Sequence, residues 1–271
     1  MLAALVLLQA VPAAAPVFAP PTDAALHVTI RRVETDGEDR RIYTAERRIR
    51  FAREESGYRA DVTVLAATGE STGMEGALYE AGYRFLIGRT IVIHLNAGGE
   101  AVAVDDLDSL WDAFCRGIAE RYATTRGVVE SEARDRFIAQ VAATLMGWPE
   151  ERRIHTFGSM VTAIAAPGPF AVPGTTEPVT IPGRGPSGES VTLSGTVETR
   201  EQGPLLYVVT SASGSVPATQ ATRVSQREAR VIDPATGLIR RSEAWSQTET
   251  GAGAERHIVT AETALTVAPE S

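Results

Sequence analysis

Apolar and polar residues alternate along much of this chain with the period of two that a β-strand requires. The segment 58–64 is the clearest case, because every even position is apolar and every odd position is polar. The segments 26–30 and 43–51 repeat the pattern, and the turn-forming residues 36–39 and 55–57 separate the three runs. The pattern therefore predicts three consecutive antiparallel strands joined by hairpins.

Further strands are predicted on both sides of the chain's centre. A strand at 90–95 returns through 100–104, whereas 74–88 could be a short helix or another strand, because its apolar residues fit neither period well. After residue 190, alternation resumes at 191–197, 205–210, 219–232, 237–248 and 256–267, and a short strand is predicted at 178–182. The total of about eleven strands predicts a mainly β (α+β) fold with one antiparallel sheet.

The segment 219–232 is polar on both faces. Such a strand fits either a sheet edge or the wall of a wet cavity. The edge is favoured, since charged residues protect an exposed edge from pairing with other chains.

Between the two β regions the apolar period changes to that of a helix. One face collects apolar residues spaced three or four apart, namely Leu107, Leu110, Trp111, Phe114, Ile118 and Tyr122. Asp105 is the predicted N-cap. A second helix is predicted at 130–147 and a helical turn at 159–166. The segment 105–166 is thus predicted to be an inserted helical hairpin, followed by a Pro/Gly-rich loop at 167–189.

The first residues predict export. Residues 1–8 are apolar, and small residues and prolines follow as far as Pro21, as in a secretory signal peptide. Cleavage is predicted after Ala13 or after Ala19, and the longer signal, 1–19, leaves 20–271 as one β-rich domain. Prolines interrupt the apolar run, so no transmembrane span is predicted. The expected location is the periplasm, where nucleotide cofactors are implausible ligands, and no cofactor is predicted.

The net charge and the residue types present exclude some classes of partner and of reaction. The net charge is −8, which argues against a nucleic-acid partner. All 26 basic residues are arginine, so lysine-based covalent catalysis is excluded. The lone Cys115 forms no internal disulfide and is expected to be buried. At five places two arginines are adjacent in sequence, and on a strand one of each pair points to each face. Solvated strand surfaces are one interpretation, and a rim that binds carboxylate or phosphate is the other.

No catalytic or metal motif is predicted. The glycine pattern at 183–188 lies in a proline-containing loop before a strand, where a dinucleotide site does not form. The acidic cluster at 105–112 lacks the pattern of a calcium loop. The four histidines are scattered, at 27, 94, 155 and 257, without zinc-site spacing.

The order of elements resembles that of the LolA-like periplasmic lipoprotein carriers. That resemblance covers most of the chain, rests on element order alone, and transfers no functional residue. It implies an open half-barrel whose concave face binds an apolar or amphiphilic ligand, such as a lipid or lipoprotein segment, with helices against it. The predicted ligand-contacting residues are Trp111, Phe114, Ile118 and Phe137. The alternatives are an interaction module of the cell envelope and, third, a hydrolase whose polar residues meet only in the fold.

Overall fold

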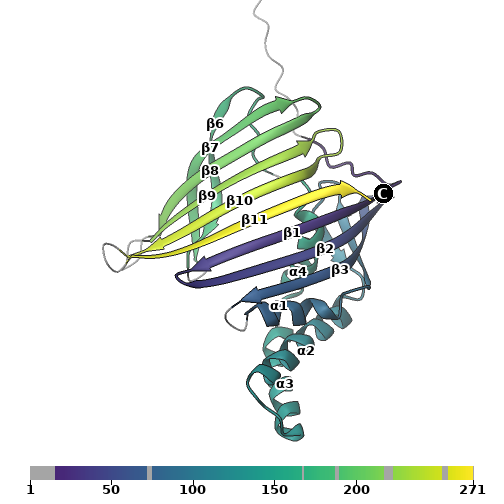
Figure 1. The fold of residues 1–271 in the computed structure, drawn as a ribbon. Coiled ribbons are helices and arrows are strands. Elements are labelled where there is room, and N and C mark those ends of the chain that lie inside the picture. Colours follow the sequence, from purple (N-terminus) through teal and green to yellow (C-terminus); the bar gives the residue numbers. More distant parts are fainter. Residues whose placement is uncertain are drawn as a thin grey trace, which may run out of the picture.

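The structure is a computed structural model that describes residues 16–71, 75–166, 168–186, 189–216, 222–251 and 256–270. Its strands form one antiparallel sheet in the order β5-β4-β3-β2-β1-β11-β10-β9-β8-β7-β6 (Figure 1). The end strands β5 and β6 do not pair with each other, so the sheet is open. The predicted class, an open curved antiparallel sheet of eleven strands with helices against it, is confirmed.

The strands are long and joined mainly by hairpins. Their bounds are β1 Ala25–Asp36, β2 Asp39–Glu54, β3 Gly57–Ser71, β4 Thr90–Asn96, β5 Ala101–Val104, β6 Thr176–Arg184, β7 Ser190–Gln202, β8 Leu205–Val216, β9 Thr222–Asp233, β10 Leu238–Thr250 and β11 His257–Pro269. In the first hairpin Asp36 pairs with Asp39, and the turn needs a positive φ, 61°, which Gly37 provides. β1 pairs with β11, which brings the two ends of the chain together in the middle of the sheet.

The helices are α1 Glu75–Arg84, α2 Leu107–Thr125, α3 Ser131–Met146 and α4 Glu150–Thr162. They begin on one face of the sheet, which we call the concave face; α4 lies against it, whereas α2 and α3 extend beyond the sheet (Figure 1). Among these described helices, none is long and apolar enough to cross a membrane. The concave face buries alternate residues of the strands, among them Leu26 and Val28 on β1 and Ile49 on β2. The apolar positions of the period-two alternation are therefore the buried ones, as the sequence predicted.

The segment from α4 to residue 175 crosses the concave face from one half of the sheet to the other. Arg47 on β2 donates a hydrogen bond to the carbonyl of Met160 at 3.3 Å. The Ile239 N–H donates to the carbonyl of Ile164 at 2.9 Å, and the Ala171 N–H donates to the hydroxyl of Thr199 on β7 at 3.1 Å. These contacts join β2, β10 and β7, so the segment fills one end of the concave face. We call residues 157–166 and 168–175 the crossing segment.

Residues 16–20 add a second connection between the two halves. The Phe18 side chain is buried and makes edge contacts with the rings of Phe51 and Tyr58, at centroid distances of 5.8 and 5.3 Å. The Ala19 N–H donates to the carbonyl of Thr236, in the turn between β9 and β10, at 2.9 Å. This segment, part of the predicted signal 1–19, belongs to the folded unit.

The structure decides one open prediction and corrects others. Of the two alternatives for 74–88, the short helix is the correct one: the region contains α1, which packs on β3 and α2. The helical turn predicted at 159–166 is the end of a longer helix, α4, so three helices occupy the insert rather than a hairpin alone. The N-cap of α2 is Asp106, with φ 53°, rather than Asp105. Asp105 is instead held by an ion pair with His94 at 3.0 Å, which competes with capping.

The edge prediction for 219–232 is wrong. β9 pairs with β8 on one side and β10 on the other, well inside the sheet. Its polar residues Gln226 and Glu228 face the open end of the concave surface, so the cavity-wall alternative is the correct one for the described part of the segment; residues 219–221 lie outside the described residues. The edge strand on that side is β6, where Pro178 and Pro182 reduce the number of N–H groups that another strand could bind.

Candidate functional site

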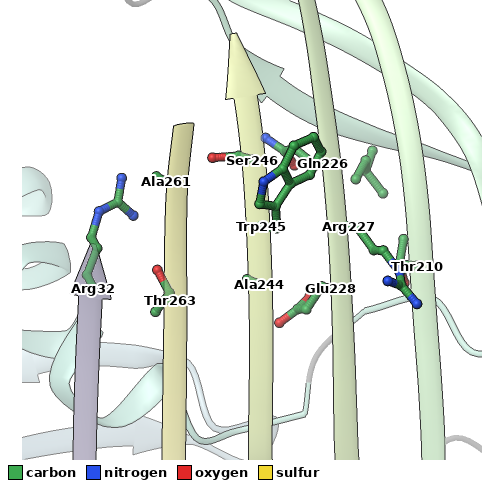
Figure 2. A pocket seen from close by; sticks show the side chains of 11 residues that line it. Arg32, Thr210, Gln226, Arg227, Glu228, Ala244, Trp245, Ser246, Ala261 and Thr263 are labelled. Carbon is green, nitrogen blue, oxygen red and sulfur yellow. The ribbon is translucent and has the colours of Figure 1, made fainter. Parts of the chain in front are cut away.

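The crossing segment leaves the other end of the concave face uncovered, and a hollow of about 290 Å³ lies there. Figure 2 shows most of its lining on five adjacent strands, β1, β11, β10, β9 and β8. Ile181 on β6 also lines the hollow. Because β1 and β6 lie six positions apart in the sheet order yet border one hollow, the sheet is strongly curved at this end.

Two cross-strand rows form the floor of the hollow. The registers align Arg32 with Thr263, Ala244, Glu228 and Thr210 in the first row. The second row contains residues two positions away on the same face, namely Ala261, Ser246, Gln226 and Ala212. Alanine, serine and threonine occupy the centre of both rows. Their short side chains cannot fill the concavity, and this explains why the hollow exists.

The charged residues of the sheet around the hollow are largely engaged with one another. The Glu228 carboxylate accepts a hydrogen bond from Ser242 at 3.1 Å and lies 3.7 Å from the guanidinium of Arg230. The Arg32 guanidinium donates to Glu34 at 2.7 Å, and Arg41 lies 3.8 Å from the same carboxylate. The charged residues that line the hollow are Arg32, Arg227 and Glu228, so the lining has a positive excess although the whole chain is acidic.

Arg230 is buried beneath the crossing segment. Its guanidinium donates to the carbonyl of Pro169 at 3.4 Å and lies over the Phe170 ring at 5.5 Å. Burial lowers the pKa of Arg230, and the charge of Glu228 partly offsets that effect. The ion pair of Arg230 and Glu228 therefore contacts the crossing segment through Arg230 and borders the hollow through Glu228.

Thr210 gives the hollow an unused polar atom. Its side chain is only 6% exposed, and its hydroxyl has no hydrogen-bond partner among the described residues. Burying an unpaired hydroxyl costs about 1–3 kcal/mol. A partner supplied by a ligand atom in the hollow would recover part of that cost.

The four predicted ligand-contacting residues lie elsewhere. Trp111 is buried, donates from its indole N–H to the carbonyl of Leu145 at 3.1 Å, and stacks on Phe114. Phe137 on α3 stacks on Tyr122 of α2 at 5.6 Å. Ile118 is half-buried on α2. Trp111 and Phe114 thus meet in one cluster and Phe137 lies in the α2–α3 hairpin, while none of the four lines the hollow. Ligand contact by these residues stays a prediction.

The structure also shows where the histidines and the cysteine considered in the sequence analysis lie. Each of three histidines faces a carboxylate across strands or loops: His27 lies 3.5 Å from Glu46, His257 lies 3.0 Å from Asp36, and His94 lies 3.0 Å from both Glu54 and Asp105. Hydrogen bonding to Glu54, and then to Asp105, raises the pKa of His94. Within the described residues, no three metal-ligating side chains are placed to hold an ion. Cys115 is buried, and burial raises its thiol pKa to about 11.

The glycine pattern at 183–188 begins on β6 and enters the β6–β7 hairpin, and its residues 187 and 188 lie outside the described residues. Sequence reasoning missed the floor of the hollow. Two sequence features pointed to it. One was the polarity of 219–232, and the other was small residues two positions apart on one face of a strand, such as Ala244 and Ser246 on β10.

No protein-family model matches this chain, and no curated protein matches it. Among solved structures, one similar chain bears the description "Lipid-protein interactions in lipovitellin". The alignment has a TM-score of 0.42 and 9% identity, and it covers 92% of this chain and 25% of that chain. The chain thus spans about a quarter of the length of that structure. At this level the likeness assigns neither a family nor a ligand.

Proposed function

We propose that this protein is exported to the periplasm and binds an amphiphilic ligand, such as a lipid or lipoprotein segment, at the open end of its concave face. The hollow floored by small residues carries the proposal. It lies on a rigid sheet, it is bordered by both charged and apolar side chains, and it contains the unpaired Thr210 hydroxyl. Ligand sites are typically concave, with a few polar groups among apolar ones.

The structure favours an amphiphile over a purely apolar ligand. The apolar half of the concave face is occupied by the protein's own crossing segment, where Met160, Val161 and Ile164 are almost fully buried. The half that remains open mixes Ile181 and alanines with Arg32, Gln226 and Glu228. A ligand there must satisfy polar groups as well as cover apolar ones.

The position of Phe18 bears on export. Cleavage after Ala19 would remove a buried aromatic side chain from the folded unit, whereas cleavage after Ala13 would keep it. We therefore propose Ala14 as the mature N-terminus. Sequencing the N-terminus of protein recovered from the periplasm tests both the export and the position.

The binding function is tested by native mass spectrometry and organic extraction of protein purified gently from its own periplasm. A stoichiometric lipid or acyl species supports it and gives the ligand class. A clean apo mass, with no ligand in the extract, contradicts it.

One observation favours the interaction module as a second candidate. The α2–α3 hairpin projects beyond the sheet, and Val129 at its tip is 90% exposed (Figure 1). Site-specific photocrosslinking from position 129 in intact cells tests this function. One reproducible envelope partner would support it, and absence of any crosslink would contradict it.

A further inference from the structure

The hollow has different chemistry at its two ends. Arg32 and Glu34, with Arg41, lie at the β1–β2 end. At the other end Ile181 borders the hollow and packs against a small apolar cluster formed by Val191, Leu193, Ala212 and Val224. The two ends are joined by the row from Arg32 to Thr210, which spans four strand spacings, or roughly 19 Å along the sheet.

We infer that the hollow binds an anionic amphiphile in one orientation, with its acid group at Arg32 and its chain running over Ala244 toward Ile181. This inference rests on the proposed function and specifies its ligand class. The acid group is a carboxylate or a phosphate, because a guanidinium binds either oxyanion through paired N–H donors.

Charge balance supports the acid group. Arg32 and Arg41 share the single carboxylate of Glu34, and the Arg32 side chain is about half exposed toward solvent. A second anion at this end therefore meets an excess of positive charge. At the other end the lining includes both Arg227 and Glu228, but the register places Glu228 on the concave face and Arg227, like Arg31, on the outer face. An acid group at that end would therefore meet the Glu228 carboxylate, which would repel it. The orientation follows from this difference.

The neighbouring arginine supplies a matched control. Arg31 and Arg32 are adjacent on β1, so their side chains point to opposite faces of the sheet. Arg31 lines a second depression, beside Val33 and Ala264, whose lining shares Arg227, Ala244, Trp245 and Thr263 with that of the hollow. Arg31→Gln and Arg32→Gln remove the same charge from the same strand, and they differ in which face loses it.

The experiment measures the affinity of delipidated protein for three probes that share a sixteen-carbon chain, by calorimetry at monomeric probe concentrations. The probes are hexadecanoate, hexadecyl phosphate and neutral hexadecanol. We expect one or both anions to bind at least about 10-fold more tightly than hexadecanol. Arg32→Gln should weaken the anions by roughly 10-fold or more and leave hexadecanol unchanged. Arg31→Gln should change none of the three.

Each outcome decides between the two proposals. Preference for hexadecanoate or for hexadecyl phosphate distinguishes carboxylate from phosphate recognition. Equal binding of all three probes, or equal effects of the two arginine variants, overturns the acid-group inference and leaves the binding function intact. Failure of every probe to bind overturns the inference and also counts against the proposed function. Circular dichroism and thermal melts verify that both variants fold.

Discussion

Replacing Phe18 with alanine should destabilise the whole sheet although the residue lies near the start of the chain. Phe18 is 6% exposed and contacts Phe51 and Tyr58 on β2 and β3. Gly99, in the β4–β5 turn, leaves room for its ring, since a Cβ there would lie 2.9 Å from it. The backbone of Ala19 is bonded to the β9–β10 turn. The side chain of Phe18 and the backbone of Ala19 together therefore join strands from both halves of the sheet.

The size of the effect follows from these contacts. Burying a phenylalanine contributes about 1.5–3 kcal/mol. Each edge contact between rings adds about 0.5–1.5 kcal/mol. Phenylalanine-to-alanine changes in cores cost about 3–5 kcal/mol. A terminal segment can detach rather than leave a cavity, so we expect the low end, about 3 kcal/mol.

Urea unfolding, followed by far-ultraviolet circular dichroism, measures the loss. Val17→Ala is the matched control, because the Val17 side chain is 70% exposed, and it should change the free energy of unfolding by less than about 0.5 kcal/mol. A protein that begins at Pro20 should lose at least as much as Phe18→Ala. A loss below about 1 kcal/mol for Phe18→Ala would refute the role given to the segment and, with it, the argument for cleavage after Ala13.

Three further outcomes are expected. The carboxylate partners of His94 raise its pKa in the folded protein above the usual 6.5. The stabilisation by His94 is therefore complete below pH 6.5 and is lost as pH rises through the folded pKa. Unfolding titrations from pH 5 to 9 should show this pH dependence, and the dependence should flatten in His94→Gln. Arg47 is 5% exposed and donates to the Met160 carbonyl of the crossing segment, so Arg47→Met leaves that buried carbonyl without its donor and should lower the free energy of unfolding by about 1–3 kcal/mol; an unchanged value in urea unfolding would contradict this. The Cys115 thiol, with a pKa of about 11, should resist iodoacetamide at pH 8 until the protein is unfolded, as mass spectrometry of the labelled protein can show.

The sequence predicted elements well where one face of a strand or helix is buried. The alternation at 58–64 and the helical spacing from Leu107 to Tyr122 each come from burial of a single face, and both elements form as expected. The sequence left α1 undecided between helix and strand because its buried positions, Gly76 and Gly82, are glycines packed against other elements, and they give no apolar period. Predicting Asp105 as an N-cap failed because a distant histidine binds its carboxylate.

The site was harder to predict than the fold, because its residues are brought together only by the register of the strand pairings. Nothing in the local sequence relates Thr210 to Arg32, yet four strand pairings place both in one row. The sequence pointed instead to the aromatic residues of α2 and α3, because large apolar side chains are the usual lining of a lipid site. In this fold Trp111 and Phe114 lie in the aromatic cluster that also contains Phe157 of α4.

The hollow is best understood through the composition of β9 and its neighbours. A strand inside a sheet is normally apolar on a face that packs against other elements. At its covered end β9 is almost fully buried, at Ile232 and also at the charged Arg230. Farther along the same face β9 carries Glu228 and Gln226, opposite the small residues Ala244 and Ser246 of β10. A crossing segment that covered this end would have to remove the Glu228 carboxylate and the Gln226 amide from water, and desolvating a charged group costs more than the apolar area would return. The polar half of β9 thus keeps the protein's own chain away and leaves the concave face open for a ligand that brings polar atoms of its own.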